Sequence, residues 1–307
     1  MDNILTASVF ATCLRLATPY VFAAIGEMFG QRSGVLNLGV DGIMLMGAFV
    51  AHYVVLQTGN LLLGVAAALA VGLLLGLVMA FINVTLKAEQ GISGIGMYLF
   101  GLGMSELLFQ NLVGTPRSVS GFPALNIPIL SDIQVLGLGQ IFFRHNLLVY
   151  VAFALVPISA WVLNRTPLGL MIRAVGQNPQ AADAMGINVS RVRYMTVSFG
   201  GMMAGLAGAS LSIALLNVFQ QNLTSGLGFI AIALVYFGRW RPYGVLLGAL
   251  LFSFVNALQL QINAIGSNIP SEFAVMAPYV ITIIALVFAS KQTEKPTALT
   301  KPFERGQ

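Results

Sequence analysis

Apolar runs of about 20 residues recur along this 307-residue chain, and they constrain its fold more than any other feature. A helix needs about 20 apolar residues to cross the hydrocarbon core of a bilayer, where every backbone amide must find its partner within the segment. Hydrophobic residues make up 57% of the sequence and charged residues only 8%, against about 25% charged residues in ordinary soluble domains. We therefore predict an all-α integral membrane protein.

The apolar pattern predicts about nine transmembrane helices, with eight or ten also compatible with it. The runs lie at 4–26, 35–57, 61–86, 92–113, 146–164, 195–216, 225–238, 243–264 and 275–290. We treat 1–290 as one transmembrane domain and 291–307 as a polar tail. The first run shows no basic leader and no small-residue cleavage site, so we expect a retained span and not a signal peptide.

Cys13 is the only cysteine, and His52 and His145 are the only histidines. A single cysteine excludes an internal disulfide, and two histidines do not form a cluster of soft metal ligands. We therefore expect neither a metal nor another cofactor. The net charge of +5 does not indicate nucleic acid in so apolar a chain, because the position of the charges relative to the membrane matters more than their sum.

The basic residues predict an orientation, because cytoplasmic loops close to spans collect Lys and Arg. If the loop 165–194 is cytoplasmic, alternation of the spans leaves only Arg117 and Arg144 in outer loops. The inner loops and tail then hold Arg32, Lys87, Arg165, Arg173, Arg191, Arg193, Arg239, Arg241, Lys291, Lys295, Lys301 and Arg305. We expect a cell-membrane protein with its N-terminus outside and its tail in the cytoplasm.

Two pairs of apolar motifs suggest an inverted repeat. "LGVDGIMLMGAF" (38–49) is followed by "LLLGVAA" (61–67), and "SGLGFIAIALVYF" (225–237) is followed by "VLLGALL" (245–251). Five spans separate the copies, so the two copies must point in opposite directions. Such repeats are typical of transporters, whose halves move about a site at the bilayer midplane.

A short polar helix is predicted in "AVGQNPQAADAMGI" (174–187). Asn178 is a good N-cap, Pro179 suits the first helical position, and Gly186 can adopt the left-handed conformation that ends a helix. So short a helix is marginal alone, so it should pack against its own protein or a partner. The alternative is an interfacial helix whose flanking arginines lie on anionic lipid.

Three segments stand out from the apolar background: "GEMFGQRSGVLNLGVDGIMLMGAF" (26–49), "RAVGQNPQAADAMGINVSRVR" (173–193) and "GFIAIALVYFGRWRPYG" (228–244). They resemble the permease subunits of ABC importers in the branched-chain amino acid, ribose and simple-sugar group. The closest similarity is to permeases of bacterial nucleoside importers that work with lipoprotein receptors. The resemblance extends from about residue 20 to residue 290.

This resemblance implies a role for the polar helix, since the cytoplasmic loop of that family carries the coupling helix that docks on the ATP-binding subunit. The implied coupling residues are Asn178, Pro179, Gln180, Ala181, Ala182, Asp183, Ala184, Met185 and Gly186. The resemblance also implies a second permease chain, related or identical, and an extracytoplasmic substrate-binding lipoprotein. No lysine of this chain follows a glycine, so it lacks a phosphate-binding P-loop. We expect a transport subunit, not an enzyme, with ATP hydrolysis on separate ATPase subunits.

Ionisable side chains at membrane depth are costly and therefore candidates for function. Asp41 follows Asn37 by four residues, which predicts a shared helix face near the start of the second span, in the substrate pathway. The alternative is that both cap this span or pair with Arg32. Glu106 and Gln110 form a similar pair near the outer end of the fourth span, where substrate contact and a bond to a neighbouring helix are both open.

The eighth span carries a polar face formed by Asn256, Gln259 and Asn263. Amides suit hydroxyls and base edges, because they offer donors and acceptors without demanding a counter-charge. Hydrogen bonds between helices explain them equally well. Phe229 in the seventh span could stack on a base or sugar ring, or pack against lipid or protein.

A pathway of amides, glycines and aromatics fits a small uncharged solute, and with the resemblance it favours a nucleoside. A sugar or branched-chain amino acid importer is the alternative, and a stand-alone secondary transporter is a rival because inverted repeats occur there too. The outer loop 114–145 could form a landing surface for the receptor or a lid. We expect a structural role for Arg15, through hydrogen bonds to carbonyls of a neighbouring span or an ion pair with one of the acids. We expect His52 to form a hydrogen bond to a neighbouring helix.

The motif "GISG" (91–94) matches the short pattern of rhomboid intramembrane proteases, in which a histidine activates a serine. Ser93 is predicted at the cytoplasmic end of its span, whereas His145 is predicted on the outer side. A chain with 33 glycines matches such a short pattern easily. We therefore reject a protease.

Overall fold

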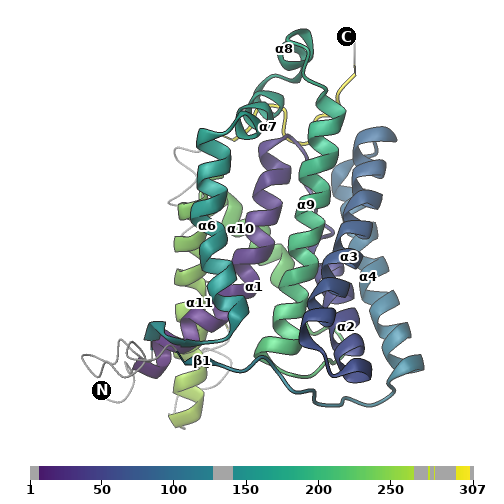
Figure 1. Cartoon of the computed structure of the whole chain (residues 1–307). Coiled ribbons are helices and arrows are strands. Elements are labelled where there is room, and N and C mark those ends of the chain that lie inside the picture. Colours follow the sequence, from purple (N-terminus) through teal and green to yellow (C-terminus); the bar gives the residue numbers. More distant parts are fainter. Residues whose placement is uncertain (1–6, 127–140, 266–275, 277–279, 281–294, 305–307) are drawn as a thin grey trace.

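The computed structural model describes residues 7–126, 141–265, 276, 280 and 295–304, and this part of the chain is almost entirely helical (Figure 1). Among these described residues, seven helices are long and apolar enough to cross a membrane. They are α1 (Ala7–Arg32), α2 (Val40–Thr58), α3 (Leu61–Ala80) with η1 (Phe81–Thr85), α4 (Gln90–Leu112), α6 (Leu147–Arg165), α9 (Val189–Ser210) with η3 (Leu211–Leu215), and α11 (Pro242–Ile265). The predicted all-α membrane fold is confirmed.

Three shorter helices complete the described part: α7 (Pro167–Gln177), α8 (Pro179–Ala184) and α10 (Leu227–Phe237). The apolar α10 corresponds to the predicted short seventh span. The predicted ninth span, 275–290, lies outside the described residues apart from two positions. A two-residue antiparallel ladder joins β1 (Leu125–Asn126) to β2 (Arg144–His145).

Polar caps fix where the helices begin. Six helices start at a side chain that accepts hydrogen bonds from N–H groups of the first turn: Asn60 for α3, Glu89 for α4, Asn146 for α6, Thr166 for α7, Asn178 for α8 and Asn188 for α9. These N–H groups have no partner within the helix, so a side-chain acceptor stabilises the helix start.

The long helix α9 packs against α1, α2 and α3, and glycines permit the close approach (Figure 1). A Cβ at Gly47 of α2 would overlap Gly205 of α9, and one at Gly72 of α3 would overlap Gly201 of α9. Small residues let helix backbones approach closely in membranes, where packing replaces the hydrophobic driving force.

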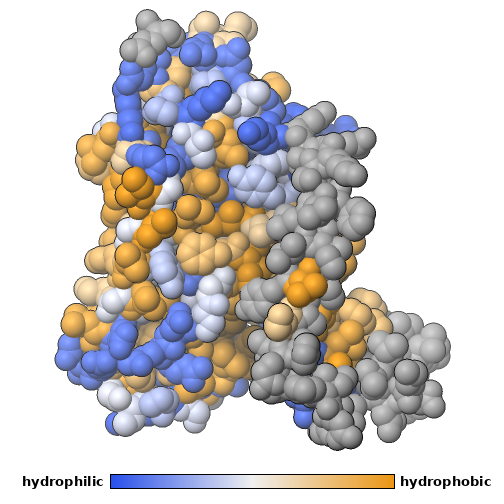
Figure 2. Space-filling view, turned by 180° about the vertical axis from the view of Figure 1, so that it is seen from behind, coloured by the Kyte–Doolittle hydropathy of each residue, from blue (hydrophilic) through white to orange (hydrophobic). Residues whose placement is uncertain are grey.

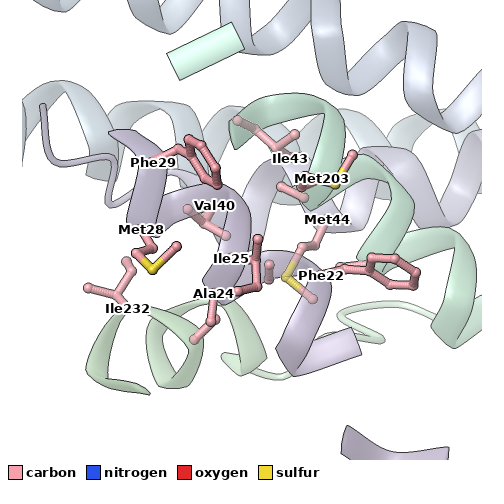
Figure 3. Packing of buried hydrophobic residues seen from close by; sticks show 14 of the residues in the cluster. Phe22, Ala24, Ile25, Met28, Phe29, Val40, Ile43, Met44, Met203 and Ile232 are labelled. Atoms are coloured by element: carbon pink, nitrogen blue, oxygen red, sulfur yellow. The ribbon is translucent and has the colours of Figure 1, made fainter. Parts of the chain in front are cut away.

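The main core lies where α1, α2, α9 and α10 meet (Figure 3). Methionines, branched aliphatic residues and phenylalanines fill it, among them Phe22, Ile25, Met28, Phe29, Val40, Ile43, Met44, Met203 and Ile232. On the face opposite to that of Figure 1, hydrophobic residues form a belt between hydrophilic ends, as a membrane protein requires (Figure 2).

The helices α2 and α10 run in opposite directions. Their N-terminal turns meet where Asp41 binds Gly228. From there, α2 leads to His52, which contacts the loop that contains Arg117. In contrast, α10 leads to Trp240, whose carbonyl binds a side chain at the end of α1. The helices α2 and α10 contain most of the motifs 38–49 and 225–237. These two motifs were predicted to point in opposite directions, and the two helices do so.

The described tail, 295–304, lies at the end of the molecule that carries α7 and α8, and the N-terminal end of α1 lies at the opposite end (Figure 1). If the predicted spans alternate in direction, the loop 165–194 and the tail must lie on the same side of the membrane, opposite the N-terminus.

Candidate functional site

Asp41 joins the N-terminal turns of α2 and α10 in the interior. Its Oδ1 accepts a hydrogen bond from the Gly228 N–H at 2.8 Å, and its Oδ2 accepts one from the Thr224 hydroxyl at 2.9 Å. The side chain is fully buried. The carboxylate caps α10, where unpaired N–H groups and the helix dipole favour an anion. The expected alternatives, a cap on its own helix or an ion pair with Arg32, are not observed.

The prediction that Asn37 and Asp41 share a helix face was wrong. Asn37 precedes α2, and its Oδ1 accepts a hydrogen bond from the Gly39 N–H at 2.8 Å. An asparagine that bonds the backbone two residues further on stabilises a turn. The segment 33–39 is therefore a connection between α1 and α2. Asn37 stabilises a turn in this connection, whereas Asp41 caps α10.

Glu27 is a buried carboxyl group that the sequence analysis missed. Its Oε1 accepts hydrogen bonds from the Asn37 N–H and from Gln31 Nε2, both at 3.0 Å. Gln31 Oε1 in turn accepts a bond from Trp240 Nε1 at 2.8 Å. The predicted first span ended at residue 26, whereas α1 continues to Arg32. The apolar residues directly after Glu27 were the signal that could have placed it inside the helix.

A cavity of about 220 Å³ lies between α1, α11, the end of α9 and the start of α10. Asn256 and Gln259 line it, whereas Asn263 does not and is exposed. The other lining residues are Leu16, Pro19, Tyr20, Leu211, Leu215, Leu227 and Leu260, so no charged side chain of the described residues lines this cavity. Asn256 Nδ2 also donates to the Tyr20 hydroxyl at 3.4 Å. Two of the three predicted amides thus share one cavity.

Two of the helices around this cavity, α1 and α9 with η3, depart from a regular α-helix where they line it. Pro19 lies inside α1 and has no N–H to donate within the helix. At η3 the chain forms a π-helical turn, in which the Leu216 N–H binds the Leu211 carbonyl five residues earlier. The first residue of α10, Leu227, also lines the cavity. Interrupted helices recur at ligand sites of membrane transporters, because they free backbone groups to contact a ligand.

Glu106 and Phe229 lie away from this cavity. Glu106 Oε1 accepts hydrogen bonds from Gln110 Nε2 at 3.1 Å and from Gln221 Nε2 at 2.8 Å. The first is the predicted pair within α4, and the second connects α4 to the segment before α10. Phe229 packs edge-on against Tyr98 of α4, with ring centroids 5.2 Å apart. Of the predicted pathway residues, only Asn256 and Gln259 therefore line this cavity.

The predicted polar helix forms as α8. Asn178 Oδ1 accepts a hydrogen bond from the Ala181 N–H at 3.0 Å, and Pro179 occupies the first turn. Gly186 follows the helix with φ +84°. The N-cap and the left-handed stop are both as predicted.

The helix α8 projects from the end of the molecule (Figure 1). Met185, directly after it, is 83% exposed, whereas Ala182 packs into the protein and is 4% exposed. A separate amphipathic helix, α7, precedes it, which the sequence analysis did not predict. The result is a small rigid projection with an apolar side chain at its tip.

Arg193 was predicted in the basic loop that flanks this helix, and the structure shows that its side chain is buried. It is 1% exposed, because α9 begins at Val189 and not at 195. Its Nε donates to the Ser33 carbonyl at 3.2 Å, and its Nη1 donates to the Lys301 carbonyl at 3.0 Å. Arg193 therefore clamps the tail to the connection between α1 and α2.

The tail 295–304 makes further contacts at this end. The Ala298 N–H binds the Gly176 carbonyl of α7 at 3.0 Å. Lys87, after η1, forms an ion pair with Glu304 at 2.7 Å. The sequence analysis predicted only a polar tail, whereas this segment ties together the connections around α8.

At the opposite end, residues 114–126, which are the described part after α4, contact α2. His52 Nε2 contacts the Arg117 carbonyl at 2.8 Å, so its partner is a loop and not the helix that we expected. A single bridge pairs Ser118 with Val218. Residues 118 and 119 are thereby joined to the segment before α10. Arg15 is exposed and donates within its own helix to Thr12, also unlike the expectation.

The chemistry of a protease is not present among the described residues. Ser93 Oγ donates to Asn83 Oδ1 at 2.6 Å, whereas His145 contacts the Ile141 carbonyl at the other end of the molecule. The described residues also contain no group of three or more side chains suited to hold a metal ion.

The family model described as "Branched-chain amino acid transport system / permease component" matches residues 9–286 of this chain. The chain belongs to this permease family. It is therefore a multi-pass membrane subunit of an ABC importer, with a transport role and not an enzymatic one. The resemblance seen in the sequence motifs is confirmed.

Full-length relatives agree on this class. The "Guanosine ABC transporter permease protein" of Bacillus subtilis is 37% identical over 317 residues, which cover 99% of this chain and 98% of the relative. The "Nucleoside ABC transporter permease protein" of Lactococcus lactis is 35% identical over 302 residues, 94% of each chain. The "Putative glucose ABC transporter permease protein" of Haloferax volcanii is 37% identical over 324 residues, 97% and 98% of the two chains. No solved structure matches.

Proposed function

We propose that this permease subunit imports a nucleoside, and that the cavity between α1, α9, α10 and α11 contacts the solute. The observation that carries the proposal is the lining of this cavity, where Asn256 and Gln259 lie near the ring of Tyr20 and no described side chain is charged. Amides can bond to base edges and ribose hydroxyls, and an aromatic ring can stack on a base. The names of the guanosine and nucleoside permeases support this choice.

A neutral sugar is the second candidate solute. The relative named for glucose is as similar to this chain as the guanosine permease. Amides also suit the hydroxyls of a sugar. At about 220 Å³ the cavity is smaller than the roughly 300–1,000 Å³ of common ligand pockets, which favours a small solute or a site completed by a second permease chain.

Uptake measurements with the assembled importer distinguish these solutes. Cells that lack their own nucleoside and glucose uptake would express the chain with the second permease chain, the ATPase and the binding lipoprotein of its importer. We expect accumulation of labelled guanosine, which unlabelled nucleosides reduce and glucose does not. Accumulation of glucose alone would reject the nucleoside proposal and support the sugar.

We further propose that α8, with residues 178–186, is the coupling helix that docks on the ATPase. Its cap at Asn178, its exposed Met185 and its anchoring through Ala182 support this role, because a transmitting element must be rigid and accessible. In this arrangement α8 and the tail are cytoplasmic and the N-terminus is outside. The loop 114–145 then faces the binding lipoprotein. A second permease chain, related or identical, completes the pathway in the cell membrane.

Co-purification tests the coupling helix. Met185→Glu places a charge at the exposed tip, so we expect loss of the ATPase subunit during purification and loss of uptake, with normal insertion. Ser190→Glu is the matched control, because Ser190 is also exposed but lies beyond α8. If a Gly/Ser linker in place of 178–186 left ATP-driven uptake undiminished, the proposed role of α8 would be rejected.

A further inference from the structure

A second cavity, of about 790 Å³, lies near the end of the molecule that carries α7 and is far larger than the one that we assign to the solute. The ends of α1 and α6, the helix α7 and the turn between α10 and α11 enclose it. Four arginines line this cavity: Arg32, Arg173, Arg239 and Arg241. The proposed function makes no use of it.

All charged side chains that line this cavity among the described residues are positive. No carboxylate of the described residues lines it, and Arg173, Arg239 and Arg241 make no ion pair in the described part of the chain. A guanidinium stays charged at all physiological pH values and binds phosphate through planar pairs of donors. Arginines gathered around one cavity repel each other, so a bound anion would stabilise them.

The turn that carries two of these arginines is held in a fixed conformation. Arg239 and Trp240 have φ +53° and +52°, a conformation that side-chain-bearing residues rarely adopt. The Trp240 indole is buried and donates a hydrogen bond to Gln31. The backbone carbonyl of Trp240 accepts a hydrogen bond from Arg32 Nε at 2.9 Å. Backbone strain that is held in place by its surroundings is typical of preformed binding sites.

The cavity opens beside surfaces suited to lipid. Tyr243 and Leu247 line it from α11 and are 56% and 65% exposed. Trp161, one turn before the end of α6, is 62% exposed. Tryptophan and tyrosine gather at the level of the lipid headgroups. The arginines therefore lie where the apolar surface of a spanning helix gives way to the polar end.

We propose that this cavity binds the phosphate of an anionic phospholipid, with the acyl chains lying along the exposed leucines of α11. The four arginines match a phosphate, and the apolar rim matches the chains attached to it. Neither a free phosphate nor an acidic protein segment would need that rim. The bound headgroup would connect α1, α7 and the turn between α10 and α11, next to the proposed coupling helix.

Lipid titration of the purified full chain tests this site, with bound lipid counted by native mass spectrometry. We expect phosphatidylglycerol to bind more tightly than phosphatidylcholine of the same chain length. The double variant Arg239→Gln, Arg241→Gln should weaken phosphatidylglycerol binding about 30-fold, since each arginine near an anionic surface contributes about fivefold. Arg173→Gln alone should weaken it about fivefold and leaves the strained turn intact.

The double variant Arg165→Gln, Arg191→Gln is the matched control. Both residues are exposed near the same end and do not line the cavity, so we expect less than a twofold change. Equal binding of the two lipids, or an equal loss in the control, would overturn the proposal. Displacement of the lipid by an equimolar amount of inorganic phosphate would also overturn it, because the site would then serve a soluble anion.

Discussion

The Asp41 carboxylate accepts a hydrogen bond from the Gly228 N–H at 2.8 Å, and this bond joins two helices that run in opposite directions from their meeting point. A Cβ on Gly228 would overlap the backbone of Asp41, so the two helix starts are as close as their atoms permit. Both helices direct their positive dipole ends to this point. One carboxylate therefore stabilises the place where the starts of α2 and α10 meet.

Replacing Asp41 should destabilise the protein. Asp41→Ala leaves the Gly228 N–H and the Thr224 hydroxyl buried without partners, at a cost of about 1–3 kcal/mol for each group. We expect a clear fall in the thermal unfolding midpoint of the detergent-solubilised protein, and a smaller fall for Asp41→Asn, which keeps one acceptor. Glu106→Gln is the control, since Glu106 is only partly buried. Equal midpoints for Asp41→Ala and the control would refute the capping role.

Two glycines of α4 should respond in opposite ways to alanine. A Cβ at Gly101 would overlap the Gly42 carbonyl of α2, whereas one at Gly103 meets no atom within 4 Å. Gly101→Ala should cost about 1–3 kcal/mol through overpacking. Gly103→Ala should be neutral or stabilise by up to about 1 kcal/mol, because alanine favours a helix. Unfolding midpoints of the two variants provide the test, and similar values would contradict the observed packing of α2 on α4.

Local signals in the sequence predicted the helices and their caps well. The start and stop of α8 follow from Asn178, Pro179 and Gly186 alone, because capping involves neighbouring residues. Apolar runs located the spanning helices for the same reason. The amides Asn256 and Gln259 were also predicted as one polar face, although the helices that complete their cavity could not be named.

Contacts between distant segments could not be predicted. Asp41 caps α10, which lies 187 residues further along the chain. The burial of Arg193 was not predicted because the predicted span began at 195, whereas α9 begins at Val189. Glu27 was missed because the predicted first span ended at 26, whereas α1 ends at Arg32. The ends of a span are the part that a hydropathy pattern locates least well. A polar residue near such an end moves between loop and helix when the predicted end is shifted by one helical turn.

The clamp formed by Arg193 should protect the tail. Arg193→Met removes the hydrogen bonds to the Ser33 and Lys301 carbonyls. We therefore expect faster amide hydrogen exchange and faster proteolysis in the tail, with little change in α2. Arg191→Met is the control, because Arg191 is exposed at the start of the same helix. If the tail were equally protected in both variants, other contacts would hold it and the clamp would be refuted.

Glu89 should stabilise the start of α4 in a pH-dependent way. Hydrogen bonds from the Ile92 and Gly91 N–H groups lower the pKa of Glu89 below its usual value of 4.5. The pKa of Glu89 is lower in the folded state than in the unfolded state. The stabilisation by this cap is therefore fully present above about pH 4.5 and is lost as the pH falls through the folded-state pKa. The midpoint difference between wild type and Glu89→Ala should therefore shrink on acidification.

Asn60→Ala is the matched control for this effect. Asn60 caps α3 in the same way and does not titrate. Its midpoint difference should stay constant over the same pH range. A constant difference for Glu89→Ala would show that the capping carboxylate does not titrate as expected.

The amides of α11 give the sharpest test of the proposed solute cavity. Asn256→Leu and Gln259→Leu each remove a group that lines it, whereas Asn263→Leu changes an exposed amide of the same helix outside it. In the proposed importer a binding lipoprotein delivers the solute, so we expect the effect in the uptake rate at saturating solute. A lost neutral hydrogen bond of about 0.5–1.5 kcal/mol corresponds to a rate about 2- to 12-fold lower.

Tyr20→Phe separates solute contact from helix packing in the same assay. It removes only the hydroxyl that accepts the bond from Asn256. If Asn256 acts mainly through that bond, Tyr20→Phe should reproduce the loss seen in Asn256→Leu, and the amide then joins helices. If Asn256 contacts the solute, Asn256→Leu should lower uptake more than Tyr20→Phe does, with ATP hydrolysis preserved. An effect of Asn263→Leu as large as that of Gln259→Leu would mean that the solute passes elsewhere.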